Sequence, residues 1–324
     1  MMKRKRTAWS LLLMVLLLSL LGTGCTNRSP KSAEQATLKA VRLGVVPLPH
    51  YAHMWIAKKK GYIDEELAKA GYKVDWQPFS LGPMVSEAFA AGHLDVGVMG
   101  DFPAFIGRSA GTDYQIVSIA STAPNALAVV VRKDSSIRSI AELKGKKVGT
   151  TRGAYGTKLL SLLLDKNGMT MNDIQFVNLT MDDLAVALVR GDVDAGVMWD
   201  PLLTRMEDAG EIRVMADGTG VYQGTAVIVA ATEFTTQNPQ AIEALKAAFA
   251  RGAQFIKENP DEAIQLLTED LKIPPDQLKK IVRKFNYDGT ITDSLVAELK
   301  DTEAFLRKTG LIKNPVDMTT FLRK

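Results

Sequence analysis

The sequence has a single cysteine, Cys25, among its 324 residues. One thiol cannot form a disulfide within the chain, and structural zinc sites use several Cys or His ligands. If Cys25 is itself modified, the mature chain has no free thiol. We therefore expect no disulfide, no thiolate metal site and no cysteine nucleophile.

Concentrated positive charge is missing outside the first few residues. The formal net charge is +4, but four of the 40 basic residues lie at positions 3–6, so the remaining basic residues equal the 36 acidic residues in number. Nucleic-acid binding usually needs a concentrated basic face. We therefore expect no nucleic-acid partner.

Long apolar runs are also missing. The run at 11–21 is nearly all Leu, Met and Val, and it is too short to cross a hydrocarbon core of ~30 Å. It follows the basic residues 3–6 and precedes the small residues 22–24. This order is typical of an export signal, so we predict a signal peptide over 1–24 that is removed from the mature chain.

Cys25 follows these small residues directly. This arrangement resembles a bacterial lipobox, although Gly22 stands three positions before the cysteine and the nearest leucine, Leu21, lies one further back. We predict that Cys25 is lipidated and that residues 25–38 form a tether, which would anchor the protein to the outer side of a bacterial cell membrane. The alternative is an ordinary signal peptide with an incidental cysteine.

Familiar catalytic and metal-binding patterns are scarce. There is no Gly-x-Ser-x-Gly segment, no Walker loop and no paired catalytic set. His50 and His53 have a spacing that allows them to share a helix face, but a third ligand at suitable spacing is missing, and His93 is predicted in a turn. We expect no enzyme activity, no cofactor and no metal.

An internal duplication is the most informative feature present. Residues 92–101 align with residues 191–200 at an offset of 99, and Gly, Asp, Gly-Val-Met and Asp stand at the same places in both copies. A helix-like segment precedes each copy, and a proline follows each one. A period this long indicates duplicated lobes and not a solenoid.

Short apolar strands alternate with helices in both halves, which implies sheets covered on both faces. We predict an α/β fold of two doubly wound lobes joined by two crossover strands at 126–132 and 224–231. The predicted boundaries are 39–128 and 225–324 for lobe I with the C-terminal helices. The inserted lobe II is predicted over 129–224.

The chain resembles the type II periplasmic binding proteins, in the branch that serves sulfonate, nitrate and taurine importers. The resemblance rests on residues 100–103, 194–201 and 140–149. It implies two lobes that close around a small anionic solute and deliver it to the permease of an ABC importer with its ATPase. We also expect a monomer. The alternative partner is a membrane receptor, with the chain acting as a sensory module.

The candidate ligand site lies in the loops after the strands, because doubly wound sheets bind ligands at the carboxyl ends of their strands. The loop at 150–157 opens a helix, where small residues and backbone N–H groups favour an anion. Its candidate residues are Thr151, Arg152, Gly153, Ala154 and Tyr155. The alternative is a plain turn with a threonine cap.

Further candidates come from the matching loops and from the duplication. Trp199 stands where the first copy has Gly100, and an aromatic side chain there could contact a carbon chain. Asp101 and Asp200 either cap helices or meet an amine or hydroxyl of the ligand. The other loop candidates are His50, Tyr51, Ser80, Gly82 and Asn125.

The ligand that this reading favours is an aliphatic sulfonate such as taurine. Nitrate, a thiamine precursor and other small organic anions are the alternatives. An enzyme on the same fold is the rival class, since related two-lobed proteins make a thiamine pyrimidine precursor with a cysteine-rich motif. This sequence has no such motif.

Overall fold

The structure is a computed structural model, and it describes residues 38–80 and 82–323. Residues 38–324 form one compact unit. The predicted signal peptide and Cys25 lie outside the described residues, as does nearly all of the predicted tether. Within the described part of the chain, no helix combines the length and the apolar character needed to cross a membrane.

The first of two sheets has five strands in the order β2-β1-β3-β10-β4. β1 pairs in parallel with β2 and β3, whereas β10 is antiparallel to both β3 and β4. The strands are β1 (Lys39–Val45), β2 (Tyr72–Pro78), β3 (Val96–Gly100), β4 (Tyr114–Ser121) and β10 (Ala226–Ala231).

The second sheet repeats this plan in the order β7-β6-β8-β5-β9. β6 is parallel to β7 and β8, and β5 is antiparallel to β8 and β9. The strands are β5 (Leu127–Arg132), β6 (Lys147–Thr150), β7 (Gln175–Asn178), β8 (Ala195–Trp199) and β9 (Ile212–Asp217). The two copies of the sequence duplication are therefore the third strand of each sheet and the turn before it.

The chain crosses between the sheets twice. It leaves β4 after Ser121 and enters the second sheet at Leu127, and it leaves β9 after Asp217 and returns at Ala226. The predicted α/β class with two doubly wound lobes is thus confirmed. The crossings lie directly before β5 and β10, and both strands are then buried inside their sheets.

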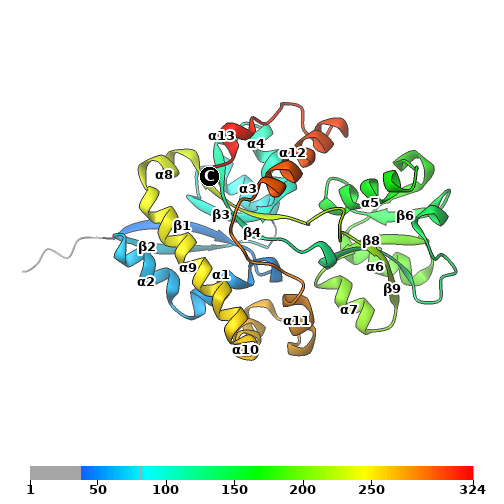
Figure 1. Cartoon of the computed structure of the whole chain (residues 1–324), viewed down its shortest axis with the longest axis horizontal. Helices are drawn as coiled ribbons and strands as arrows, with labels where there is room; N and C mark the ends of the chain where they lie inside the picture. Colours follow the sequence, from blue (N-terminus) through cyan, green and yellow to red (C-terminus); the bar gives the residue numbers. More distant parts are fainter. Residues whose placement is uncertain (1–37, 81, 324) are drawn as a thin grey trace, which may run out of the picture. The chain divides into compact units, whose positions relative to one another are not determined.

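Helices cover both sheets, and the last six follow β10 (Figure 1). α9 packs against α1 and α2, while α12 packs against α4 and α11 against α7. The helices are α1 (Ala52–Lys59), α2 (Tyr62–Lys69), α3 (Gly82–Ala90), α4 (Asp101–Ser109), α5 (Tyr155–Lys166), α6 (Met181–Arg190), α7 (Leu202–Asp208), α8 (Thr232–Gln237), α9 (Pro239–Glu258), α10 (Pro260–Leu271), α11 (Pro275–Val282), α12 (Asp293–Lys308) and α13 (Met318–Phe321).

The duplicated glycines have a packing role. A Cβ atom at Gly97 in β3 would lie 2.8 Å from Val85 of α3, and one at Gly196 in β8 would lie 2.7 Å from Leu184 of α6. Both distances are shorter than an ordinary contact between carbon atoms, which is about 3.5–4.0 Å. Glycine at these two positions therefore lets an equivalent helix lie close to each sheet.

Candidate functional site

A cavity of about 570 Å³ lies between the two lobes. The first sheet and its helices contribute the segments around His50, Gly82 and Asp101, and the second contributes those around Tyr155 and Trp199. Parallel strands of both sheets end at this cavity, where doubly wound folds hold their ligands.

Most of the residues selected from the sequence line this cavity. They are His50, Tyr51, Gly82, Gly100, Asp101, Thr151, Arg152, Gly153, Ala154, Tyr155 and Trp199. Ser80, Asn125 and Asp200 are not among the lining residues. The loop at His50 in one lobe and the loop at Tyr155 in the other, about a hundred residues apart in the sequence, thus lie at the same cavity.

Asp200 is turned away from the cavity and is fully buried. Its Oδ1 accepts a hydrogen bond from the backbone N–H of Thr204 at 2.9 Å, and its Oδ2 lies 2.9 Å from Lys284 Nζ. Lys284 Nζ also donates to the Thr204 hydroxyl. Both carboxylate oxygens therefore have partners within the protein. Asp200 connects the start of α7 to the segment after α11.

Four helices begin at the cavity. The first residues of α3, α4 and α6 line it, as do Ala154 and Tyr155 at the start of α5. No side chain caps α5, whereas the Thr180 hydroxyl accepts the N–H of Asp183 at the start of α6. The start of α5 carries partial positive charge and N–H groups without a side-chain partner, which favours an anion there. At the start of α4 the first N–H groups already donate within the protein.

Arg152 lies on the exposed rim of the cavity. Its backbone N–H donates to Asn178 Oδ1 at 2.8 Å, and its guanidinium lies 4.7 Å from the centre of the Phe176 ring. The neighbouring Thr151 hydroxyl donates to the carbonyl of Leu179 at 2.8 Å. The loop is therefore held by its own hydrogen bonds, and the arginine places positive charge near the α5 N-terminus.

Aromatic side chains form the wall beside the start of α5. The Tyr155 and Trp199 ring centres lie 5.0 Å apart, and the Tyr155 hydroxyl lies 3.5 Å from His50 Nε2 of the other lobe. Burial lowers the pKa of His50 to about 4 and raises that of Tyr155. Both groups are neutral at pH 7, and the wall can contact the carbon chain of a ligand.

Asp101 contributes a carboxylate whose charge is satisfied within the protein. It accepts hydrogen bonds from the Tyr222 hydroxyl at 3.1 Å, the Thr302 hydroxyl at 3.0 Å and the N–H of Phe102 at 2.8 Å. Burial raises the pKa of Asp101, and the nearby Lys158 ammonium opposes that shift. Lys158 Nζ itself lies 2.6 Å from the Thr302 hydroxyl oxygen.

Sequence reasoning missed the start of α6, where Thr180, Met181 and Asp182 line the cavity. The duplication could have predicted this segment, because the offset of 99 aligns Met181 and Asp182 with Gly82 and Pro83. It missed the start of β10 as well, where Gly224, Thr225 and Ala226 are lining residues. The missed residues include no His or Cys, and over the described residues no group of three or more His, Cys, Asp or Glu side chains could hold a metal ion.

A family model described as NMT1/THI5 like matches residues 48–263. The chain belongs to this family. The matched region includes β3 to β10 and all of the lining residues from Leu48 to Ala226.

Proteins that are named for binding are similar to this chain over most of its length. A Bacillus subtilis (strain 168) protein named "Putative aliphatic sulfonates-binding protein" is 28% identical over 93% of this chain and 92% of its own. The crystal structure of the periplasmic aliphatic sulphonate binding protein SsuA from Escherichia coli superposes with a TM-score of 0.82 at 26% identity. That match covers 88% of this chain and 92% of SsuA.

An enzyme is also similar to the chain, over a smaller part. The 4-amino-5-hydroxymethyl-2-methylpyrimidine phosphate synthase of Aspergillus parasiticus is 26% identical over 67% of this chain and 66% of its own. The proteins similar to this chain thus include some named for binding and one named for catalysis, so function has to be argued from the cavity.

Proposed function

We propose that this chain is the extracytoplasmic solute-binding component of an ABC importer, and that it captures a small oxyanion such as an aliphatic sulfonate or taurine. The observation that carries the proposal is the meeting of four helix N-termini at an aromatic-walled cavity between two lobes. The names of the most similar relatives support it.

In this proposal the anionic head binds at the uncapped start of α5, where the N–H groups of Tyr155 and Gly156 are donors. Arg152 adds positive charge at the rim. Tyr155 and Trp199 contact the carbon chain of the ligand. A nitrate ion would leave most of a cavity of about 570 Å³ unfilled, which favours the larger organic anion.

Catalysis is the rival function, supported by the fungal synthase. The carboxylate of Asp101 is engaged by Tyr222, Thr302 and Phe102, which argues against Asp101 as a general base. A general base needs an available proton acceptor near the substrate. A sensory module would use the same cavity, and permease and ATPase genes beside this one would favour transport.

Calorimetry on the full chain in detergent tests the ligand. We expect hexanesulfonate and taurine to bind and nitrate to bind far more weakly. Arg152→Ala should weaken sulfonate binding by about tenfold to a hundredfold, since a hydrogen bond to a charged group is worth roughly 1.5–3 kcal/mol. Lys313→Ala, at an exposed position outside the cavity, is the matched control. Failure of every sulfonate to bind would exclude the proposed ligand class.

The proposal includes a lipid anchor at Cys25 and a tether over 25–38. Labelling of cells with a fatty acid that carries a detectable tag should mark the wild-type protein, and Cys25→Ser should remove the mark. An unlabelled wild type, or a labelled serine variant, would contradict the anchor. The partner membrane protein is the permease, and we propose that the chain acts as a monomer.

A further inference from the structure

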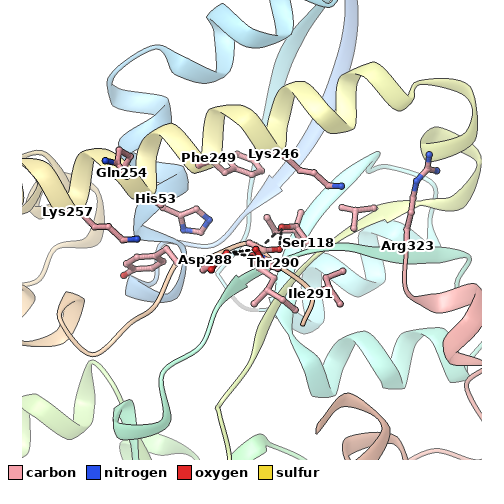
Figure 2. Close-up of a pocket in the computed structure, with 17 residues that line it drawn as sticks. His53, Ser118, Lys246, Phe249, Gln254, Lys257, Asp288, Thr290, Ile291 and Arg323 are labelled. Atoms are coloured by element: carbon pink, nitrogen blue, oxygen red, sulfur yellow. Dashed lines mark hydrogen bonds between the residues drawn. The ribbon is translucent and has the colours of Figure 1, made fainter. Parts of the chain in front are cut away.

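A second cavity, of about 660 Å³, lies wholly within the part of the chain built on the first sheet (Figure 2). It lies between α9, the edge strand β4 and the segment 287–291. It shares no lining residue with the cavity between the lobes. A ligand here would therefore be a different molecule, or a second copy, from the solute held between the lobes.

The inner wall of this second cavity is apolar. β4 contributes Val117 and Ile119, β10 contributes Ile228 and α9 contributes Phe249, and all four side chains belong to the buried core. Tyr287 adds a further ring from the segment after α11. These surfaces suit the apolar body of an organic molecule and not a bare inorganic ion.

His53 of α1 presents an unsatisfied polar group to this wall. The residue is 2% exposed, and its Nδ1 has no hydrogen-bond partner among the residues the structure describes. Its ring lies 5.0 Å from Tyr287 and 5.9 Å from Phe249. A buried polar atom without a partner is costly, so a ligand that hydrogen-bonds the imidazole would remove a penalty.

Basic side chains surround the opening. Figure 2 shows Lys257 at one end and Lys246 and Arg323 toward the other. Lys246 pairs with Glu243 at 3.0 Å, and Arg323 Nη1 donates to the carbonyl of Thr235 at 2.9 Å. Among the described residues, no carboxylate lies within 4.0 Å of the Lys257 ammonium to form an ion pair.

One carboxylate, that of Asp288, also belongs to the lining. Its Oδ1 accepts hydrogen bonds from the Thr290 N–H at 3.0 Å and from the Thr290 hydroxyl at 2.6 Å. These bonds lower the pKa of Asp288, so it is ionised at pH 7. Apart from the lysine that is already paired with a glutamate, two cations against this one anion leave the opening positive, which favours a ligand with negative charge.

We propose that this pocket binds a small aromatic carboxylic acid. The ring of the acid lies against Phe249, Tyr287 and the aliphatic wall, and its carboxylate faces Lys257 and the His53 imidazole. The inference does not depend on the function of the cavity between the lobes, because the two share no residue.

Fluorine NMR with 4-fluorobenzoate as the probe tests this pocket on the full chain in detergent. Ala250 lines the cavity from an exposed position on α9, so Ala250→Trp fills the pocket without disturbing the core. Ala247 is also exposed on α9 but does not line the cavity, and Ala247→Trp is the matched control. We expect saturable binding that Ala250→Trp weakens at least about tenfold and that Ala247→Trp leaves within about twofold.

The charge of the ligand is tested separately. Lys257→Gln should weaken 4-fluorobenzoate binding by about tenfold, whereas Lys308→Gln at an exposed position of α12 should not change it. The uncharged 4-fluorobenzyl alcohol should bind more weakly than the acid. No saturable binding, binding that survives Ala250→Trp, or an alcohol that binds as well as the acid would each overturn the proposal.

Discussion

Asp101 and Asp200 occupy the same place in the duplication but have different partners. Asp101 lines the cavity between the lobes and accepts hydrogen bonds from Tyr222 and Thr302. Asp200 is fully buried beside Lys284 and does not line the cavity. A residue's place in the repeat therefore gives its backbone position, whereas its role depends on which helix packs against it.

Asp200→Asn should lower the free energy of unfolding and leave ligand choice unchanged. The amide can still accept from the Thr204 N–H, but the charge that opposes Lys284 is lost, at a cost of roughly 1–3 kcal/mol. Urea unfolding measures the loss. The ratio of taurine to ethanesulfonate affinity, measured by calorimetry, should stay within about twofold of the wild type.

Asp208→Asn is the matched control, because Asp208 of α7 pairs with Lys280 of α11 at 2.6 Å, and this lysine is exposed. Surface pairs contribute about 0–1 kcal/mol, so this variant should lose less stability. A selective loss of taurine binding in Asp200→Asn would instead place the carboxylate in contact with the ligand amine.

His53 should make stability depend on pH. Burial lowers its pKa in the folded state to about 3, below its ordinary value of 6.5. Below pH 6.5 the unfolded chain takes up a proton that the folded chain refuses, so the free energy of unfolding falls as the pH falls from 6.5 toward 3. At pH 5 the loss from this group should be ~1–2 kcal/mol relative to pH 7.

Replacement of the ring isolates this effect. In His53→Phe, the stability difference between pH 7 and pH 5 should shrink by that amount in urea unfolding, whatever the variant's stability at pH 7. His93 is exposed, and His93→Phe should keep the pH dependence of the wild type. Equal pH dependence in all three proteins would show that His53 is accessible to protons in the folded state.

At the scale of elements, the duplicated Gly-Val-Met segments set the distance between a helix and its sheet. Gly97→Ala would place a methyl group 2.8 Å from Val85, and Gly196→Ala would place one 2.7 Å from Leu184. Each should destabilise the protein by ~1–3 kcal/mol through overpacking. At Gly100 the nearest atom lies at 3.7 Å, so Gly100→Ala should change stability by less than ~0.5 kcal/mol in the same assay.

The elements themselves were largely predictable from the sequence. The crossover strands predicted at 126–132 and 224–231 correspond to β5 and β10 within one or two residues, because strands that are buried on both faces have continuous apolar sequences. The duplication predicted two similar lobes, and the structure shows the same strand plan twice. The loops after the strands were predicted to hold the ligand, because doubly wound sheets bind ligands at the carboxyl ends of their strands.

Side-chain direction was not predictable in the same way. Nothing in the sequence shows that Lys284 lies beside Asp200, or that the Arg152 guanidinium lies over Phe176, since these pairs come from helices and strands distant in the chain. The pocket around His53 depends likewise on α1, α9 and the segment 287–291 meeting at one place. Such contacts depend on packing and not on local sequence patterns.

At the scale of the whole molecule, we expect the two lobes to close on the ligand. We infer that the lobe built on the second sheet moves against the lobe built on the first, with the movement at the chain segments ahead of β5 and β10, because hinges are a few residues at the ends of elements. Small-angle scattering should give a smaller radius of gyration with saturating hexanesulfonate than without it. An unchanged radius at proven saturation would count against the hinge.

The position of β10 has a consequence for the order of events during synthesis. It lies between β3 and β4, yet the ribosome makes it after every strand of the second sheet. Until it arrives, the facing edges of β3 and β4 stay unpaired, and exposed strand edges invite association with other chains. A nascent chain that stops before Ala226 therefore holds an unfinished first sheet beside a second sheet whose strands have all been made.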